Sequence, residues 1–258
     1  MPKGIYAAAS AMYTERRSLD AIAQNLANAS TVGYRRAEAL RGSFAQTLAD
    51  THGRNGGIDG DGGAGIHQAG IWRDYSQGTS RETGRDLDVS LDGPGFFMVQ
   101  ADDGETLLTR AGHLTVDDQN RLVGQHGWPV LGQDGPIVLP ENSLAIQIDE
   151  RGRILSVVQG DAGLENEFIE QLRIVELAAG SQEDLRPRNG QFFSSNGVEL
   201  EDSVNSRVHQ GRLEDANLNA VTELVKMITI QRHYEAAQKA LSQQSRTGEG
   251  FSEIIHRA

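Results

Sequence analysis

The sequence contains no cysteine, few basic residues for its acidic content, and no long apolar run. Without cysteine, disulfides, thiolate metal sites and cysteine nucleophiles are excluded. Lysine and arginine total 24 against 36 aspartates and glutamates, which gives a formal net charge of −12. Phosphate contacts need clustered Lys and Arg, so this balance argues against nucleic acid and against an anionic membrane surface. No stretch approaches the roughly 18 apolar residues that a transmembrane helix requires.

Motifs for catalysis and cofactor binding are missing as well. The seven histidines show no metal-ligand spacing, and neither a Gly-x-Ser-x-Gly elbow nor a Walker lysine is present. Paired carboxylates such as Asp117/Asp118 and Asp149/Glu150 fall in predicted turns, where Asp is favoured for local hydrogen bonds. We therefore predict no catalytic residue, no metal site, no cofactor and no small-molecule substrate.

The longest stretch with one helical period is Glu214–Gln244. A stripe of its residues alternates at spacings of four and three, as in the seam of a coiled coil: Ala220, Leu224, Met227, Gln231, Tyr234, Gln238 and Leu241. A predicted helix at Lys3–Asn28 has a matching stripe, with Glu15 as its only polar position: Ile5, Ala8, Met12, Leu19, Ile22 and Leu26. We predict that these helices pack against each other or against copies of themselves. The alternative is a half-exposed helix in an ordinary bundle.

The residues between the two helices have the pattern of short strands. Alternation predicts strands at 86–91, 96–99, 114–116, 121–123, 146–148 and 172–174, and a last hairpin at 189–200. The turns at 117–121 and 149–153 place Asn120 and Gly152 where a positive φ is needed. Before this region, residues 34–48 are predicted to be a short helix or an extended arm with Arg35, Arg36 and Arg41 exposed. The glycine-rich residues 52–70 are predicted to be a loop.

These patterns predict an α+β fold. The N- and C-terminal helices pair as a coiled-coil-like base, and a mostly antiparallel β domain is inserted between them. The expected boundaries are 1–40 for the N-terminal helical segment, 41–84 for a glycine-rich extended linker, 85–207 for the β domain, and 208–258 for the C-terminal helical segment. We expect the N-terminus to be mature structure rather than a cleaved signal, because Thr14–Arg17 interrupts its short apolar run.

Three motifs resemble those of the bacterial flagellar rod and hook proteins. The first is Asn25–Tyr34, NLANASTVGY, which is similar to the N-terminal signature of that family. The second is Asp92–Val99, DGPGFFMV, followed by LTRAG at Leu108–Gly112. The third combines GRLE at Gly211–Glu214 with Asn217, Met227-Ile228 and QRHYE at Gln231–Glu235. The family has Ser where Asp215-Ala216 precede Asn217 here, although Asn219 can still cap the following helix.

The resemblance implies a structural axial subunit of the flagellar basal-body rod, part of the drive shaft required for motility. It implies helical polymerisation with copies of itself and with other rod proteins, export by the flagellar apparatus without a cleaved signal, and a place in the periplasm-spanning rod. Proximal-rod members are the most similar, because of the length and the segments at 85–89 and 135–140. The residues that it marks as an assembly interface are Ile5, Met12, Leu19, Ile22, Asn25, Leu26, Asn28, Gly33, Tyr34, Asn217, Leu224, Met227, Ile228, Gln231, Tyr234 and Leu241.

Other functions remain open at this point. Within the family, the chain could be a distal-rod or a hook-type subunit. In a different class, the β domain could bind or hydrolyse cell-wall carbohydrate, which would require two carboxylates facing one cleft about 5–10 Å apart. A soluble oligomeric scaffold unrelated to flagella is the third possibility.

Overall fold

The structure is a computed structural model that describes residues 3–43, 66–160, 163–178, 185–188 and 190–257, with the backbone alone for 3–7, 41–43, 66–69, 160 and 244–257. The chain forms two compact units. The first contains residues 1–27, 37–74 and 219–258, and the second contains residues 28–36 and 75–218. Among the residues described, no helix combines the length and apolar character needed to cross a membrane.

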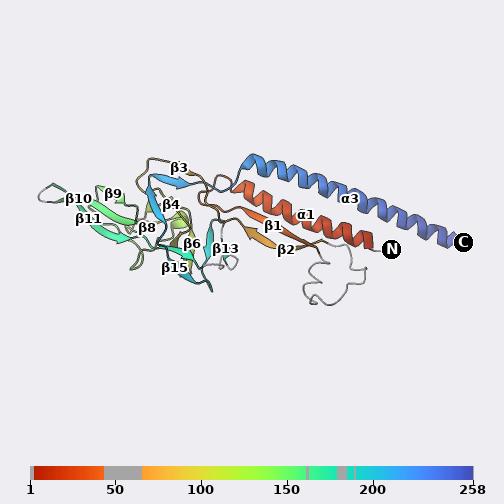
Figure 1. Cartoon of the computed structure of the whole chain (residues 1–258), viewed down its shortest axis with the longest axis horizontal. Coiled ribbons are helices and arrows are strands. Elements are labelled where there is room, and N and C mark those ends of the chain that lie inside the picture. The colour runs from red at the N-terminus through yellow and green to blue at the C-terminus, as the bar shows by residue number, and fades with distance from the viewer. Residues whose placement is uncertain (1–2, 44–65, 161–162, 179–184, 189, 258) are drawn as a thin grey trace. The chain divides into compact units, whose positions relative to one another are not determined.

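The first unit is made of two long helices and a β-hairpin. Helix α1 spans Lys3–Ala27 and helix α3 spans Ala220–Arg257, while strands β1 (Ala37–Ser43) and β2 (Ile66–Arg73) pair in antiparallel fashion. Helix α1 contacts α3 as well as both strands, and it lies between α3 and the hairpin in Figure 1. Strand β1 lies in the segment that was predicted to be a short helix or an extended arm. Residues 66–70, the end of the predicted glycine-rich loop, belong to strand β2. Residues 44–65 lie outside the described part.

The two helices run antiparallel to each other. Near the start of α3, the Asn25 side chain on α1 hydrogen-bonds Glu223, and further along Glu15 lies 3.9 Å from His233. The residue numbers therefore increase in opposite directions along the pair. The prediction of terminal helices around a mostly antiparallel β domain is confirmed at the level of an α+β fold.

The second unit is a β domain, and every strand pair among its described residues is antiparallel. Its largest sheet has six strands in the order β13-β14-β6-β5-β12-β15, and a second sheet has the order β11-β10-β9. Three two-stranded sheets, β16-β4, β17-β3 and β7-β8, complete it. The bounds are β3 Ser80–Glu82, β4 Val89–Asp92, β5 Phe96–Gln100, β6 Thr106–Thr109, β7 Thr115–Val116, β8 Leu122–Val123, β9 Ala145–Ile148, β10 Arg153–Gly160, β11 Gly163–Gln171, β12 Ile174–Leu177, β13 Arg186–Arg188, β14 Phe192–Ser194, β15 Leu200–Asp202, β16 Arg207–Gln210 and β17 Arg212–Glu214; a short 3-10 helix, η1, spans Gln125–Gly127.

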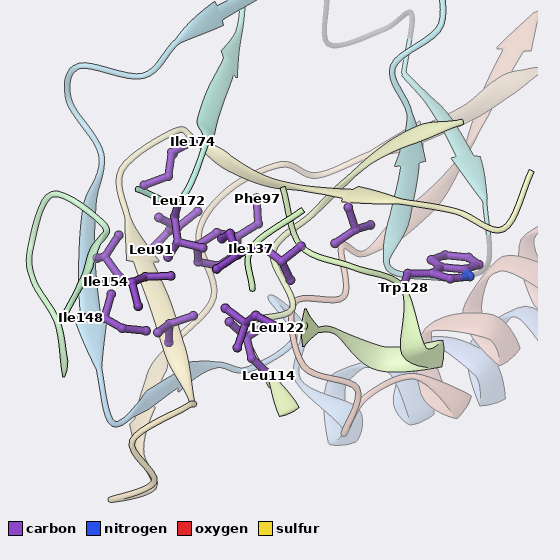
Figure 2. Close-up of a cluster of buried hydrophobic side chains, with 14 of the residues drawn as sticks. Leu91, Phe97, Leu114, Leu122, Trp128, Ile137, Ile148, Ile154, Leu172 and Ile174 are labelled. Atoms are coloured by element: carbon purple, nitrogen blue, oxygen red, sulfur yellow. The ribbon is translucent and has the colours of Figure 1, made fainter. Parts of the chain in front are cut away.

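The six-stranded sheet is buried on both faces at its centre. In β5, Phe97 and Val99 belong to one apolar cluster while Phe96 and Met98 belong to another. Successive side chains of a strand point to opposite faces, so this alternation places one cluster on each side of the sheet. Figure 2 shows the first cluster, where Phe97 lies among side chains that come from several strands and from the loops between them. The unbroken apolar run FFMV is thus explained by a strand that has no solvent-facing side.

Two turns of the β domain have the same geometry. Asn120 (φ 59°) and Gly152 (φ 76°) occupy the predicted positions of positive φ. In each turn the backbone N–H of that residue donates to the carbonyl oxygen of an aspartate three residues earlier, Asp117 or Asp149. The prediction from turn chemistry is confirmed in both cases.

The predicted hairpin at 189–200 is wrong in its pairing. Strand β14 pairs with β13 on one edge and with β6 on the other, whereas β15 pairs with β12. The alternating pattern identifies the two strands correctly, but it contains no information about which neighbour each strand takes.

Candidate assembly surface

The turn that follows α1 depends on a glycine at position 33. Gly33 has φ +70°, and a Cβ built on it would lie 2.5 Å from the backbone nitrogen of Ala111. Its N–H donates to the carbonyl oxygen of Glu214 at 2.8 Å. Any side chain at this position would both disfavour the backbone conformation and collide with the neighbouring backbone. The close approach therefore explains why the motif has glycine there.

A buried group of three charged side chains lies next to this turn. Arg35 and Glu214 are both fully buried, with Nη1 of Arg35 2.6 Å from Oε1 of Glu214. Nη1 of Arg110 lies 3.4 Å from Oε2 of the same carboxylate, and Nη2 of Arg110 donates to the carbonyl of Gly93 at 2.6 Å. The backbone N–H of Gly78 donates to Oε1 of Glu214 at 2.9 Å. One carboxylate thus holds two arginines from distant parts of the chain, and we call Arg35, Arg110 and Glu214 the buried ion cluster.

The expectation that Arg35 is exposed is wrong, because Glu214 supplies a partner for it inside the β domain. Charged side chains are rarely buried unless they are paired, and the pairing partner here is 179 positions away, from 35 to 214. Burial lowers the pKa of Arg110 to about 10, although the Glu214 carboxylate acts in the opposite direction. The sequence signals for this cluster were Arg110 in the LTRAG motif and Glu214 at the end of the GRLE motif.

Asn217, three residues after Glu214, also binds the segment that follows α1. Its Oδ1 accepts a hydrogen bond from the backbone N–H of Arg36 at 2.7 Å, and its own N–H donates to the carbonyl of Tyr34. Its Nδ2 donates to the carbonyl of Ser76 at 3.0 Å. Tyr34 is fully buried, and Asn28 is half-buried. The second unit therefore brings together Asn28, Gly33, Tyr34 and Asn217.

In the first unit, Asn25 links α1 to both of its neighbours. Its side-chain amide exchanges two 2.8 Å hydrogen bonds with the backbone of Ala37 in β1. Its Nδ2 also donates to Oε2 of Glu223 in α3 at 3.0 Å, and Lys226 donates to the other oxygen of that carboxylate. Asn25 and Glu223 are both almost completely buried. The amide of Asn25 thus satisfies polar groups of three elements at their common contact.

The face of α3 toward α1 is not the predicted stripe. Apart from Lys226, which pairs with Glu223, the less exposed positions follow spacings of four and three: Glu223, Met227, Ile230, Tyr234, Ala237 and Leu241. Met227, Tyr234 and Leu241 were predicted on this face, but Leu224, Gln231 and Gln238 are exposed. Glu223 takes the first inner position because Asn25 and Lys226 provide hydrogen bonds to its carboxylate.

The outer face of α3 has a continuous apolar stripe. Val221, Leu224, Val225 and Ile228 are between 45% and 70% exposed. Their spacing of three, one and three keeps them on one side of a helix, and their mean direction is opposite to that of the inner face. We call these four residues the outer stripe. Of the predicted interface residues, Leu224 and Ile228 belong to it, and Gln231 lies one turn further along.

Helix α1 presents most of its predicted stripe toward its neighbours. Ile22 is 7% exposed, and Met12, Leu19 and Leu26 are half-buried. Ile5 lies in the helix, but its side chain is outside the described part. A second row of buried residues, Thr14, Ser18, Ala21 and Asn25, lies beside this stripe, and Asn25 connects that row to β1. Helix α1 is therefore covered on two adjacent sides.

The carboxylates considered for hydrolysis have structural partners. Asp117 accepts hydrogen bonds from the backbone N–H groups of Gln119 and Arg121, and Asp149 accepts the equivalent bonds from Arg151 and Arg153. Although burial acts to raise the pKa of each aspartate, these hydrogen bonds and the arginine charge lower it below the ordinary value. A general acid at neutral pH needs a raised pKa, so these groups have the opposite tendency.

Three family models match the chain in order. The model described as flagella basal body rod protein matches residues 5–35, the flagellar hook protein FlgE/F/G D1 domain matches 90–156, and the flagellar basal body rod FlgEFG protein C-terminal model matches 209–247. The first includes Asn25 and Gly33, and the third includes Glu214 and the outer stripe.

Relatives match over nearly the whole length. The flagellar basal-body rod protein FlgF of Escherichia coli is 32% identical over 253 residues, covering 94% of each chain. FlgF of Caulobacter vibrioides is 30% identical and covers 93% of each chain. FlgG of Buchnera aphidicola is 30% identical, covering 87% of this chain and 89% of the relative. These comparisons do not support the cell-wall hydrolase alternative. The chain belongs to the family of flagellar basal-body rod proteins and is a structural subunit of the rod in the bacterial flagellum.

Proposed function

We propose that this rod subunit polymerises helically, with copies of itself and with other rod proteins, through the outer surfaces of its terminal helices. The observation that carries the proposal is the outer stripe of α3. Four large apolar side chains in one exposed row are unusual for a helix that already has a covered inner face, and contiguous exposed apolar surface is typical of interaction sites. Burying one such side chain contributes about 1.5–3 kcal/mol.

Several of the other predicted interface residues are proposed to support the outer stripe from the covered side of the helices. Met12, Leu19, Met227, Tyr234 and Leu241 lie where α1 and α3 contact each other. We propose a coiled-coil-like pairing of these helices as the base from which the outer stripe is presented. Asn25 supports it, because it hydrogen-bonds both α3 and β1.

We further propose that the chain acts by assembly and not by catalysis. Asp117 and Asp149 satisfy backbone N–H groups of their own turns, which accounts for their presence without a reaction. On the resemblance alone, we propose a proximal position in the rod, with a distal or hook-type position as the alternative, and export by the flagellar export apparatus without a cleaved signal.

The substitution Leu224→Asp tests the proposal. A carboxylate in the outer stripe would have to be desolvated in an apolar contact, so incorporation into rods and motility in soft agar are expected to be lost. The purified variant is expected to keep the thermal transition of the β domain, because Leu224 is exposed in the subunit. Incorporation is measured by immunoblot of isolated basal bodies from a strain in which the variant replaces the native protein.

Thr229→Asp is the matched control. Thr229 is exposed on the same helix at the edge of the outer stripe but is polar and not one of its four residues, and its hydroxyl donates to the carbonyl of Val225. This variant is expected to assemble and to restore motility. If Leu224→Asp assembled as well as Thr229→Asp, the outer stripe would not be the assembly surface.

A further inference from the structure

Helix α1 has a third side that is exposed. Its predicted stripe, which includes Glu15 near His233 of α3, is followed one residue later by a row of exposed residues. One residue turns a helix by about 100°, so this row lies well away from the α3 side. Arg17 flanks the row and donates to the hydroxyl of Tyr13 at 3.2 Å, which adds a second positive charge there. The row has spacings of four and three, and we call it the α1 row: Ala9, Tyr13, Arg16, Asp20, Ala23 and Ala27.

The outer stripe of α3 continues into charged residues. Arg232, Glu235 and Lys239 follow Ile228 at spacings of four, three and four, so they lie on the same side of the helix. All three are exposed, and within the described part of the chain none of them takes part in an ion pair. The resulting row is apolar in its first half and charged in its second, and we call it the α3 row: Val221, Val225, Ile228, Arg232, Glu235 and Lys239.

The two rows are complementary in one antiparallel register. Because both alternate between spacings of four and three, a single alignment brings these pairs opposite each other: Val225 and Ala27, Ile228 and Ala23, Arg232 and Asp20, Glu235 and Arg16, Lys239 and Tyr13. The first two pairs place a branched apolar side chain on an alanine, the next two join opposite charges, and the last puts an ammonium beside an aromatic ring. A shift of seven residues in either direction keeps at most one pair of opposite charges.

We propose that the α3 row of one copy packs antiparallel on the α1 row of the next copy. The inference rests on the proposed polymerisation and names the surface that covers the outer stripe. The order of the charges identifies a second copy as the occupant, because the sequence that complements the α3 row lies exposed in the same chain. Copies that point in the same direction bring these helices together antiparallel, since α1 and α3 are antiparallel within each copy.

A parallel register satisfies the charges without burying the outer stripe. It pairs Arg16 with Glu235, but Val221 and Val225 then lie beyond Ala9, where the α1 row ends. It also requires neighbouring copies to point in opposite directions. The antiparallel register is preferred because it covers the apolar half and the charged half of the α3 row together.

The contact gives a series of copies both a rise and a curvature. Within a copy Asn25 meets Glu223, so position 27 is level with position 221, whereas between copies Ala27 meets Val225. This difference of four residues displaces each copy by roughly 6 Å along the helix axis. The α1 row is about 100° from the side of α1 that faces α3, rather than opposite it, so successive helices follow a curve. Heterologous contacts that curve and rise do not close into a ring, and they produce a helical filament.

Cross-linking between copies tests the register, and the absence of native cysteine makes it specific. Ala27→Cys and Val225→Cys are made in separate copies and expressed together in a strain that lacks the native protein. After treatment of isolated basal bodies with a short thiol-to-thiol cross-linker, a covalent dimer is expected from the mixture and from neither variant alone. The control mixes Ala27→Cys with Lys239→Cys and is expected to form no dimer, because Lys239 is roughly 20 Å along the helix from Val225.

Other products would overturn the inference. A dimer from Val225→Cys alone would show contact between two α3 helices, and a dimer from the control mixture would show a different register. A product that joins Val225→Cys to a different rod protein in place of the expected dimer, identified by mass spectrometry, would show that a second copy is not the occupant.

Motility and incorporation separate the two levels of the proposal. Cross-linking is interpreted in strains where the variants support motility, with Ala23→Cys and Ile228→Cys as the replacement pair if the first pair does not. Motile cells with no product from either pair would overturn the register and leave polymerisation through the helices standing. Failure of the cysteine-free parent chain to enter basal bodies would contradict the proposed function itself.

Exchange of one charge pair tests the same contact without cysteine. Asp20→Arg and Arg232→Asp are each expected to lower incorporation into basal bodies about tenfold, because like charges then face each other at the interface. The double substitution restores opposite charges and is expected to restore incorporation. Both residues are exposed in the subunit, so the thermal transition of the purified variants should not change. Full incorporation of the single variants, or a double variant no better than either, would contradict the inference.

Discussion

At the scale of single residues, the buried ion cluster fixes the segment after α1 to the β domain. Glu214 is fully buried, and its carboxylate contacts both Arg35 and Arg110. An ion group taken out of water is stabilised only when its members keep their partners, so removing one partner is far more costly than removing an exposed charge. The cluster is therefore a specific point at which the residue after the N-terminal signature, the LTRAG motif and the GRLE motif depend on one another.

Glu214→Gln is expected to destabilise the protein by about 3–5 kcal/mol, because it removes the buried negative charge that pairs with Arg35 and Arg110. Urea denaturation followed by circular dichroism measures the free energy of unfolding. Asp215→Asn is the adjacent control, since the ion pair between Arg81 and Asp215 is solvent-exposed and is expected to contribute about 0–1 kcal/mol. Equal effects of the two substitutions would show that the burial of Glu214 has no energetic consequence.

At the scale of elements, the repeated turns show how aspartate stabilises a tight connection. In each turn the carboxylate accepts two backbone N–H groups and also pairs with an arginine, Arg121 or Arg153. These interactions require the ionised carboxylate, and they lower the pKa of Asp149 below its ordinary value of 3.8. A carboxyl whose pKa is lowered by folding stabilises the native state above its unfolded pKa, and this contribution is lost as pH falls through the folded value.

Asp149→Asn is therefore expected to lower the melting temperature at pH 7. The difference from the unsubstituted protein should persist at pH 5 and should shrink below a pH of 3.8, as first the unfolded and then, at lower pH, the native carboxyl becomes protonated. Thermal unfolding at a series of pH values measures it. Glu150→Gln removes a charge from the same turn, where the carboxylate is only 3.9 Å from an exposed Arg207, and should have little effect at any pH. A difference that did not depend on pH would contradict the role of the ionised carboxylate.

Also at this scale, helix α3 shows what periodicity can and cannot predict. The spacing of four and three correctly identifies a long helix and three of its inner residues, Met227, Tyr234 and Leu241. The first half of α3 is apolar on two sides, however, so periodicity alone does not reveal which side faces α1. Glu223 lies inward because Asn25 provides a donor, and Leu224 consequently lies outward.

At the scale of the whole molecule, the β domain extends beyond its expected limits of 85 and 207. Strand β3, at Ser80–Glu82, pairs with β17, at Arg212–Glu214. Both strands belong to the unit that contains residues 75–218 and 28–36. A free subunit outside the rod would lack the partners that we propose for the outer stripe, so its terminal helices would have fewer tertiary contacts than in the rod. Helix stability in proteins comes mostly from such contacts.

Limited proteolysis of the purified monomer is expected to cleave the terminal helices first. The resistant core should contain residues 75–218 rather than 85–207, because β3 and β17 pair with each other outside the narrower limits. Residues 28–36 should stay bound to it, because they belong to the same unit and Arg35 is buried against Glu214. Mass spectrometry of the fragment locates its ends. Intact termini under conditions that cleave exposed loops would show that the helices are already stable in the monomer.

The sequence by itself determined the features that depend on local preference. The order of helix, β domain and helix follows from hydrophobic periodicity, the turns at Asn120 and Gly152 follow from the conformational freedom of Asn and Gly, and the family follows from three short motifs. Only the tertiary structure decided which charged residues are buried and which apolar residues remain exposed. Arg35 is buried because Glu214 meets it, and Leu224 is exposed because Glu223 meets Asn25. Each of these outcomes depends on a partner far away in the sequence, and no local pattern contains that information.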